Sequence, residues 1–278
     1  MPELPEVEAV KNTLRQLIIG KKVENVSVTY PKLIKKPDDV QQFQTMLQGE
    51  IIEEIGRRGK FLLLYTTNYT LVSHLRMEGK YRLFDATEEK AKHTHVVFRF
   101  TDGTELRYQD VRKFGTMHLF QKGDEKISHP LIELGPEPLS PNLTVSYLQE
   151  ILQKSHRKIK VILLDQHVLV GLGNIYVDEV LYRSRIHPER EAASLLEEEI
   201  QTLYQEIVHT LSEAIAKGGS TIRTYVNSQG KIGTFQQQLL VYGHEGEPCN
   251  VCGSIIMKTV VGGRGTHYCA VCQQKEKD

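Results

Sequence analysis

The only four cysteines of the chain lie close to its C-terminal end. They form two Cys-x2-Cys pairs separated by 16 residues, and they are Cys249, Cys252, Cys269 and Cys272. Four thiolates at this spacing suit one tetrahedral zinc ion. Because protein ligands then occupy all four positions, no position stays open for a substrate. The sequence therefore predicts one structural Zn²⁺ ion.

The N-terminal residues Met1-Pro2-Glu3 offer a second kind of chemistry. If Met1 is removed, Pro2 presents a secondary amine that can attack the C1′ carbon of a deoxynucleotide and form an iminium once the base has left. Glu3 can move protons to the sugar oxygen or the departing base. An α-amine has a pKa of about 7.7–8.0, and we hypothesise that a helix N-terminus at Pro5 favours its neutral, nucleophilic form.

Three short basic segments, 57–60, 112–113 and 156–160, are candidate binding groups, although a charged face exposed to solvent is the usual alternative for segments this small. Lys60 follows a glycine, which permits close approach of a ligand to the backbone, and we expect it to begin a strand. In 110–115 a cation, Arg112, stands near an aromatic residue, Phe114, on a turn. That pair suits a wedge in a base stack, with the arginine facing the orphaned base. Packing in the core is the alternative for Phe114.

Two glycine-containing segments lie further along the chain. In 171–174 we expect Asn174 to cap a helix whose first amides face a phosphate, although a plain helix start is the alternative. The segment lacks the full pattern of a dinucleotide-binding loop. Residues 262–265 should join two strands of the zinc module and place Arg264 at the tip of the hairpin.

The elements that must position these residues follow from periodicity. Apolar residues from Val7 to Ile18 form one stripe of an amphipathic helix. Between residues 22 and 121, short apolar and β-branched runs alternate with glycine, asparagine and aspartate, which predicts a β-sandwich. A first strand starts at Val23, a helix covers 38–47, and further strands cover 51–55, 60–66, 69–75, 80–84, 95–100, 105–108 and 116–120.

Beyond a proline-rich linker at 130–141, the pattern becomes helical. The predicted helices cover 145–154, 160–164, 175–185 and 192–217, the last ending at Gly218-Gly219. We therefore expect an α+β fold with three parts: an N-terminal β-sandwich domain flanked by helices (2–131), a helical domain (132–234) that includes a loop at 218–234, and a C-terminal β-hairpin zinc finger (235–274).

Composition also bears on the partners and the cellular location of the protein. Lysine plus arginine and aspartate plus glutamate both total 35, so the net charge argues neither for nor against nucleic acid. Cysteines committed to zinc leave none for disulfides, which suits a reducing cytoplasm. The acidic N-terminus is unlike a signal peptide, and no apolar run reaches the ~20 residues of a membrane span. We expect a cytoplasmic, soluble protein with no membrane partner.

Taken together, these segments resemble the bacterial formamidopyrimidine-DNA glycosylase family along nearly the whole chain. The matching segments are Pro-Glu-Leu-Pro-Glu-Val-Glu at 2–8, Arg-Arg-Gly-Lys at 57–60, Ser-His-Leu-Arg-Met-Glu-Gly-Lys at 73–80, Asp-Val-Arg-Lys-Phe-Gly at 110–115, Gly-Leu-Gly-Asn-Ile-Tyr at 171–176 and Gly-Gly-Arg-Gly-Thr-His-Tyr-Cys at 262–269. Leu4-Pro5 is typical of this branch, whereas the related endonuclease VIII branch usually has Gly-Pro there.

The resemblance implies a β-sandwich, a helix–two-turns–helix domain and a zinc finger, with double-stranded DNA between two lobes. It implies a monomeric, nucleoid-associated base-excision repair enzyme. Such an enzyme removes oxidised purines, such as 8-oxoguanine and formamidopyrimidines, and then nicks the strand as an AP lyase by β,δ-elimination. Two alternatives stay open: an endonuclease VIII-like glycosylase for oxidised pyrimidines, and a non-catalytic zinc-ribbon protein that binds damaged DNA.

The resemblance also implies roles for individual residues. The catalytic group comprises Pro2 as Schiff-base nucleophile, Glu3 as acid, Lys60 in β-elimination and Arg264 in δ-elimination. The DNA-binding group comprises His93, Arg112, Asn174, Met77, Phe114 and one of 156–158, for which we take Arg157. Within it, Met77, Arg112 and Phe114 fill the hole left by the flipped base. The lesion-recognition group comprises Glu78, Ser220, Thr221, Arg223, Thr224 and Tyr225.

Overall fold

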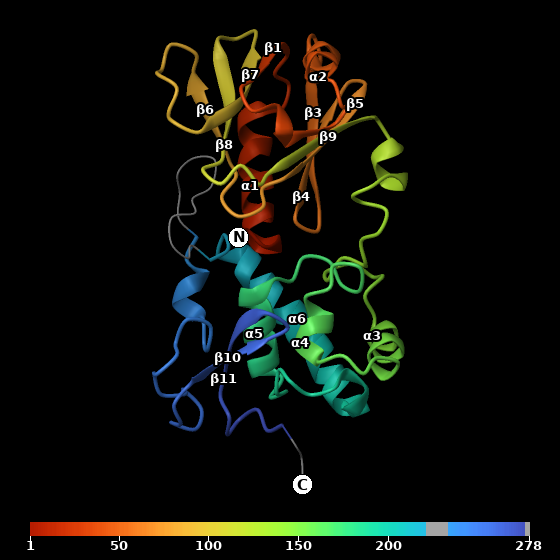
Figure 1. Cartoon of the computed structure of the whole chain (residues 1–278), viewed down its shortest axis with the longest axis vertical. Helices are drawn as coiled ribbons and strands as arrows, with labels where there is room; N and C mark the ends of the chain where they lie inside the picture. The colour runs from red at the N-terminus through yellow and green to blue at the C-terminus, as the bar shows by residue number, and fades with distance from the viewer. Residues whose placement is uncertain (221–232, 276–278) are drawn as a thin grey trace. The chain divides into compact units, whose positions relative to one another are not determined.

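A computed structural model of the chain describes residues 1–220 and 233–275. The chain divides into two compact units. The first contains Met1–Glu133 and Gly218–Thr234, and the second contains Leu134–Lys217 and Phe235–Asp278. Figure 1 shows the fold, with labels on most of the helices and strands of each unit.

The first unit begins with helix α1 (Leu4–Ile18), and its buried face contains the predicted stripe from Val7 to Ile18. The helix begins at Leu4, so Pro5 is its second residue and Glu3 its N-cap. The Glu3 amide donates to the Glu6 carboxylate at 2.8 Å. A proline this early costs little, because the first amides of a helix have no partner within it.

Within the described residues of the first unit, nine strands follow in two sheets. The four-stranded sheet has the order β1 (Val23–Val28), β7 (Thr94–Phe100), β8 (Thr104–Gln109) and β6 (Lys80–Asp85). The five-stranded sheet has the order β2 (Ile34–Lys36), β9 (Thr116–Gln121), β5 (Tyr69–His74), β4 (Phe61–Thr66) and β3 (Ile52–Arg58). All neighbours pair antiparallel except β2 and β9, which are parallel.

A single apolar core holds these layers together. Buried side chains of both sheets, of α1 and of α2 (Val40–Leu47) form one continuous cluster. Helix α1 packs mainly on β3, and α2 packs mainly on β1. Each fully buried Leu, Ile or Val side chain stabilises the fold by about 1.5–3 kcal/mol. The predicted β-sandwich flanked by helices is confirmed.

The sequence did not predict β2 or the single helical turns η1 (Pro31–Leu33) and η2 (Asp124–Ile127). Three residues are too few to show a strand period. Strand β2 forms at the edge of its sheet because β9 offers it a parallel partner.

The second unit is mainly helical, with a β-hairpin near its end. Its helices are α3 (Val145–Gln153), α4 (Ile159–Leu163), α5 (Asn174–Arg183) and α6 (Glu197–Ala216), and its hairpin consists of β10 (Met257–Val261) and β11 (Arg264–Tyr268). Single helical turns lie at η3 (Ala192–Ser194) and η4 (Phe235–Gln238). Helix α6 packs on α3 and α5, and α5 also packs on β11.

The prediction of one helix over 192–217 is wrong. The chain is extended at Leu195 and Leu196, and α6 begins only at Glu197. The Glu199 carboxylate accepts the Leu196 amide at 2.9 Å and both terminal guanidinium nitrogens of Arg190 at 2.6 and 2.9 Å. This buried capping contact starts the helix, and periodicity alone cannot reveal it. Within 1–220 and 233–275, no helix is both long and apolar enough to cross a bilayer.

Candidate functional site

The proposed nucleophile lies at the start of α1. Pro2 is buried, and Glu3 is only 3 % exposed. With Met1 attached, the Pro2 nitrogen belongs to a peptide bond, so only removal of Met1 can make it an amine.

The proposed elimination residue lies in a tight turn between β3 and β4. Arg58 pairs with Phe61, which leaves Gly59 and Lys60 as the two turn residues. Gly59 has a φ of +56°, a conformation that glycine adopts without steric cost. Lys60 is 6 % exposed, and β4 begins one residue after it rather than at Lys60 as predicted.

A charged bridge joins this turn to α1. The Arg57 Nε donates to the Glu8 carboxylate at 2.8 Å, and another guanidinium nitrogen donates to the Gly59 carbonyl at 2.9 Å. Lys11 also contacts Glu8. Burial raises the pKa of Glu8, but the hydrogen bonds and charges of Lys11 and Arg57 outweigh burial, so its pKa lies below 4.5. The ionised Glu8 therefore holds the Lys60 turn beside α1.

Strand register brings two further loops to the same end of the sandwich. Phe61 pairs with His74, and His74 pairs with Thr116. The loops that follow β5 and precede β9, residues 75–79 and 110–115, therefore emerge beside the Lys60 turn. They carry the candidate residues Met77, Glu78, Arg112 and Phe114.

Phe114 is 53 % exposed, so the alternative that it packs in the core is wrong. The Arg112 guanidinium lies 4.8 Å from the centre of the Phe114 ring, a cation–π contact. Met77 is 36 % exposed on the neighbouring loop. The His93 carbonyl accepts the Asp110 amide at 3.1 Å, which places His93 next to the same loop.

His74 supplies a neutral ring beside the Lys60 turn. Its ring lies edge-on to Phe61 at 4.5 Å, and its Nδ1 accepts the Arg76 amide at 2.9 Å. Burial, and then the charges of Arg76 and Lys60, lower the pKa of His74 from 6.5 to about 3. His74 therefore adds no positive charge near Lys60 at neutral pH.

Ser220 is tied to the first turn of α1. The Glu6 Oε1 accepts the Ser220 amide at 2.7 Å and its hydroxyl at 3.1 Å, while the other Glu6 oxygen accepts the Glu3 amide. One buried carboxylate thus joins two segments of the first unit. The other predicted lesion-recognition residues of this loop, Thr221, Arg223, Thr224 and Tyr225, lie outside the described residues.

The second unit carries the metal centre. The sulfur atoms of Cys249, Cys252, Cys269 and Cys272 all lie within 4.8 Å of one another. Sulfurs around a tetrahedral zinc with Zn–S bonds of about 2.3 Å stand ~3.8 Å apart, so the cluster fits. The Tyr182 hydroxyl lies 3.1 Å from the Cys249 sulfur, and burial together with the sulfur raises the pKa of Tyr182. Tyr182 therefore stays a protonated donor to this ligand.

Arg264 differs in position from its prediction. It is exposed and is the first residue of β11, paired with Val261, so the turn consists only of Gly262 and Gly263. Arg264 therefore flanks the hairpin turn and does not occupy its tip.

Asn174 also differs from its prediction. Gly173 is the N-cap of α5 and Asn174 is its first residue. The Asn174 side-chain amide donates at 2.8 Å to the carbonyl of Gly265, the residue after Arg264. Its side-chain oxygen is buried and has no hydrogen-bond partner among the described residues.

A buried ion pair fixes strand β11, which contains Arg264 and Gly265. Lys160 and Asp178 have fully buried side chains and lie 2.5 Å apart. Lys160 also donates to the Gly265 carbonyl at 3.1 Å and to the Thr266 hydroxyl at 2.8 Å. Asp178 accepts the His267 amide at 2.9 Å. The pair therefore links α4 and α5 to β11.

Arg157 lies elsewhere on the second unit. Its side chain is 50 % exposed and donates to Asp165 at 2.9 Å. The neighbouring His156 and Lys158 contact Glu191 and Glu189. Each of these side chains has an acidic partner, so phosphate would compete with an existing contact.

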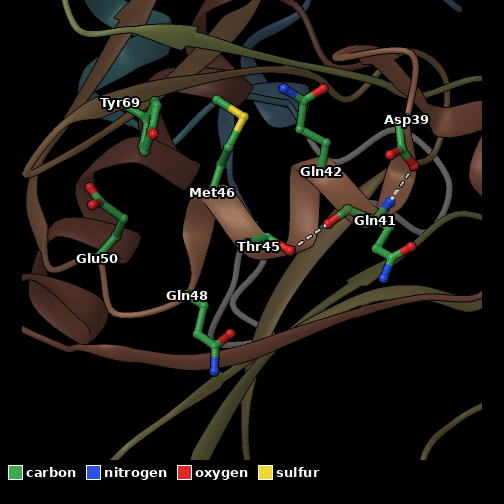
Figure 2. Close-up of a pocket in the computed structure, with 8 residues that line it drawn as sticks. All are labelled: Asp39, Gln41, Gln42, Thr45, Met46, Gln48, Glu50 and Tyr69. Atoms are coloured by element: carbon green, nitrogen blue, oxygen red, sulfur yellow. Dashed lines mark hydrogen bonds between the residues drawn. The ribbon is translucent and has the colours of Figure 1, made fainter.

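A surface hollow on the first unit is unrelated to these residues. It follows the outer side of α2, and Figure 2 shows its mostly polar lining, with Asp39 accepting the Gln41 amide at 2.9 Å. Figure 1 shows α2 and the N-terminus at opposite ends of the unit. None of the candidate residues lines this hollow.

Comparisons with known proteins cover nearly the whole chain. Residues 1–117 match the family described as Formamidopyrimidine-DNA glycosylase N-terminal domain, and residues 134–226 match its H2TH domain. Residues 246–275 match the zinc finger found in FPG and IleRS. The Formamidopyrimidine-DNA glycosylase of Bacillus cereus is 66 % identical over 275 residues, which cover 99 % of this chain and 100 % of the relative.

The chain belongs to the formamidopyrimidine-DNA glycosylase family. The relative from Halalkalibacterium halodurans, which has the same name, is 60 % identical, with coverage of 99 % and 100 %. A solved complex between the Lactococcus lactis Fpg and DNA containing an abasic site has a TM-score of 0.93 and 44 % identity, covering 99 % of this chain and 100 % of that one. The predicted fold class and the single structural zinc of this glycosylase are thereby confirmed.

Several positioning residues of this glycosylase were not identified from the sequence. Glu6 lies three residues after Glu3, a spacing typical of a capping box, and this signal could have been used. Arg57 belongs to a recognised basic segment, but its partner Glu8 could not be inferred. Nothing in the local sequence around Asp178 indicates its pairing with Lys160, because the partner lies 18 residues away.

Replacing Asp178 with Asn should strongly destabilise the second unit. The change leaves Lys160 buried without its counter-charge, which typically costs 3–5 kcal/mol. Denaturant unfolding of the zinc-loaded protein measures the loss. Glu189→Gln, which removes the negative charge that pairs with Lys158 and Lys275 at the surface, serves as the control and should cost about 0–1 kcal/mol. Equal effects of the two changes would contradict the structural role of the buried pair.

Acidification should destabilise the first unit partly through His74. Its pKa is 6.5 ordinarily and about 3 when folded. Between these values the unfolded chain binds a proton that the folded chain does not. The unfolding free energy therefore falls as the pH drops from 6.5 toward 3, by about 1.4 kcal/mol per pH unit for one such group.

Urea unfolding at several pH values tests this contribution. His74→Gln should reduce the slope of unfolding free energy against pH below 6.5. His129→Gln alters a histidine of the same unit whose side chain is 72 % exposed and should leave the slope unchanged. An unchanged slope in His74→Gln means that His74 is not held neutral in the folded protein.

Proposed function

We propose that this chain is a bifunctional base-excision repair enzyme that acts on oxidised purines in double-stranded DNA. As a member of its family with 66 % identity over nearly the whole chain, it is a DNA glycosylase. Its substrates are 8-oxoguanine and formamidopyrimidines, and its second activity is an AP lyase. The Bacillus relatives all have the name of the purine-directed branch. Their name supports oxidised purines, rather than oxidised pyrimidines, as the substrates.

One observation carries the proposal. Within the first unit, the start of α1 and the Lys60 turn are held together by the Arg57–Glu8 bridge. A potential amine, a carboxylate and a lysine thus come from two segments of the chain to one end of the sandwich. This is the set that Schiff-base chemistry at a sugar carbon requires.

The proposed chemistry proceeds in three steps. The Pro2 nitrogen bonds to C1′ while the bond from C1′ to the base breaks, and Glu3 transfers the proton that the leaving base or the sugar oxygen needs. The C1′–O4′ bond of the sugar then breaks, the ring oxygen takes up a proton, and the Pro2 nitrogen, having lost its own proton, forms an iminium cation with C1′ that acts as an electron sink. Lys60 then assists loss of the C2′ proton and departure of the 3′ phosphate, and Arg264 assists departure of the 5′ phosphate.

The target nucleotide must leave the base stack, because C1′ is shielded in an intact duplex. We assign Met77, Arg112 and Phe114 to the space that it leaves. His93, Arg112, Asn174 and Arg157 are assigned to contacts with DNA, and Glu78 and the loop from Ser220 to Tyr225 to the damaged base. The exposure of Phe114 and its stacking on Arg112 support the first assignment.

The zinc ion supplies no chemical step in this proposal. The four cysteines hold it, and it stabilises the hairpin that carries Arg264. We further propose a cytoplasmic, nucleoid-associated monomer, with domains at 2–131, 132–234 and 235–274.

Borohydride reduction during turnover on a duplex with 8-oxoguanine should trap a covalent adduct between DNA and the protein. The adduct should map to Pro2, because only a Schiff base is reducible. A peptide extension ahead of Met1 should abolish trapping and excision, since it blocks the amine, whereas the same extension after Asp278 should change neither. Mass analysis of the digested adduct identifies the residue, and an adduct on any lysine would overturn the assignment.

Glu3→Gln provides a second arm of the same experiment. The substitution should abolish excision and leave binding to the lesion duplex intact, because it removes a proton carrier and not a DNA contact.

The class of lesion that the enzyme prefers is tested by comparing the 8-oxoguanine duplex with a duplex that contains thymine glycol. Faster release of thymine glycol than of 8-oxoguanine would favour the pyrimidine-directed alternative.

Arg264→Ala should weaken DNA binding and lower its salt dependence. Loss of one phosphate contact reduces the slope of log K against log salt by about 0.9. Fluorescence anisotropy at several salt concentrations measures the slope. Lys258→Ala removes one positive charge from the same hairpin and is the control, since Lys258 pairs with Glu245. Identical slopes for the two variants would show that Arg264 does not contact phosphate.

A further inference from the structure

Two loops of the first unit carry the three side chains proposed to fill the space of the flipped base. Residues 75–79 lead from β5 to β6, and residues 110–115 lead from β8 to β9. Strands β5 and β9 are neighbours in one sheet, and β6 and β8 are neighbours in the other. Both loops therefore cross between the sheets at one end of the sandwich.

The register shows that the loops cross side by side. His74, before the first loop, pairs with Thr116, after the second, and Lys80 pairs with Gln109. Each loop also holds one residue other than glycine in the left-handed region, Arg76 at φ +53° and Lys113 at φ +58°. In residues other than glycine this backbone conformation costs free energy, and it persists only where the surrounding structure fixes it. The two residues directly precede Met77 and Phe114.

The side chain of Tyr108 lies between these two loops. It is fully buried, and its hydroxyl approaches Gly79 of one loop and Gly115 of the other. A Cβ atom would stand 2.3 Å from the hydroxyl oxygen at Gly79 and 1.7 Å from it at Gly115. Neither position can carry a side chain while Tyr108 keeps its place. The hydroxyl therefore occupies a slot that both glycines form.

Asp110 completes this arrangement. Its carboxylate accepts the Arg112 amide at 3.0 Å, the Gly115 amide at 2.9 Å and the Tyr108 hydroxyl at 3.3 Å. One buried carboxylate thus fixes both ends of the loop that carries Arg112 and Phe114, and it also contacts the tyrosine that touches the other loop.

We propose that Tyr108 is a positioning residue for base flipping, which sets the place of the Met77 loop relative to the Arg112–Phe114 loop. The three side chains then enter the duplex as one wedge of fixed shape. This inference rests on the proposed role of Met77, Arg112 and Phe114. Tyr108 is fully buried, so its role is to position its neighbours, among them the two glycines and Asp110.

Tyr108→Phe tests the proposal, because it removes the hydroxyl and keeps the packed ring. Tyr81→Phe is a matched control: Tyr81 is equally buried, its ring lies 5.0 Å from that of Tyr108, and its hydroxyl donates to Ser73 at 2.7 Å. Each variant loses one buried hydroxyl, and both hydroxyls belong to the same apolar core. Only Tyr108→Phe loosens the two loops.

Three measurements separate positioning from folding. In single-turnover excision of 8-oxoguanine from a duplex, Tyr108→Phe should be slower by about threefold to tenfold, the fold-change expected for one lost buried hydrogen bond. The fluorescence of 2-aminopurine beside the lesion should show slower or smaller unstacking. Borohydride trapping on single-stranded DNA with an abasic site needs no wedge and should stay within about twofold of the wild type.

Tyr81→Phe should leave the duplex rate and the fluorescence unchanged, even if both variants lower the melting temperature equally. Equal duplex rates for Tyr108→Phe and the wild type, or equal losses in both variants, would overturn the proposal. Failure of the wild type to trap on the abasic strand would instead contradict the Schiff-base chemistry, so the two failures can be told apart.

Gly115→Ala adds an independent arm. Its methyl group meets the Tyr108 hydroxyl first, so the change should slow duplex excision more in the wild type than in the Tyr108→Phe background. Such non-additivity is expected only if the two residues are in contact. Additive effects would show that the hydroxyl does not set the position of this loop.

Discussion

Antiparallel pairing of β4 with β5 and of β5 with β9 determines where the side chains of the proposed site in the first unit emerge. Phe61, His74 and Thr116 share one row across these strands, and the proposed elimination lysine and both exposed loops follow from that row. A shift of one residue in either pairing would reverse the faces of a whole strand. The apolar core opposes such a shift, because it would expose the buried side of the strand. Stability of the sandwich and placement of the site therefore have the same origin.

Buried carboxylates carry out the finer positioning in both units. Glu6 joins α1 to Ser220, Asp110 closes one loop, and Asp178 joins two helices to the zinc hairpin. In each case the carboxylate accepts backbone amides, so it fixes the path of the chain and not only a side chain. A buried carboxylate without such partners is costly, which makes each arrangement sensitive to the loss of any member.

Much of the fold could be predicted from the sequence, because its main elements follow simple periods. The stripe of α1, the strand runs and the cysteine spacing each give a local signal, and all three appear in the structure. Asn174, Arg264 and the start of α6 were placed differently from their predictions. The Asn174 side chain donates to the Gly265 carbonyl, 91 residues away, and Glu199 in the first turn of α6 forms an ion pair with Arg190. Contacts between distant segments decide these details, and a local pattern does not contain them.

The zinc hairpin is attached to the helices at more places than its metal site. Strand β11 packs along α5, Lys160 and Asn174 both hold the Gly265 carbonyl, and the hairpin turn lies so close to α4 that a Cβ on Gly262 would stand 2.7 Å from a Val161 methyl group. The zinc finger is therefore packed against the helices and is not connected to them by the chain alone. A displacement of Arg264 therefore also strains the contacts that the hairpin makes with α4 and α5.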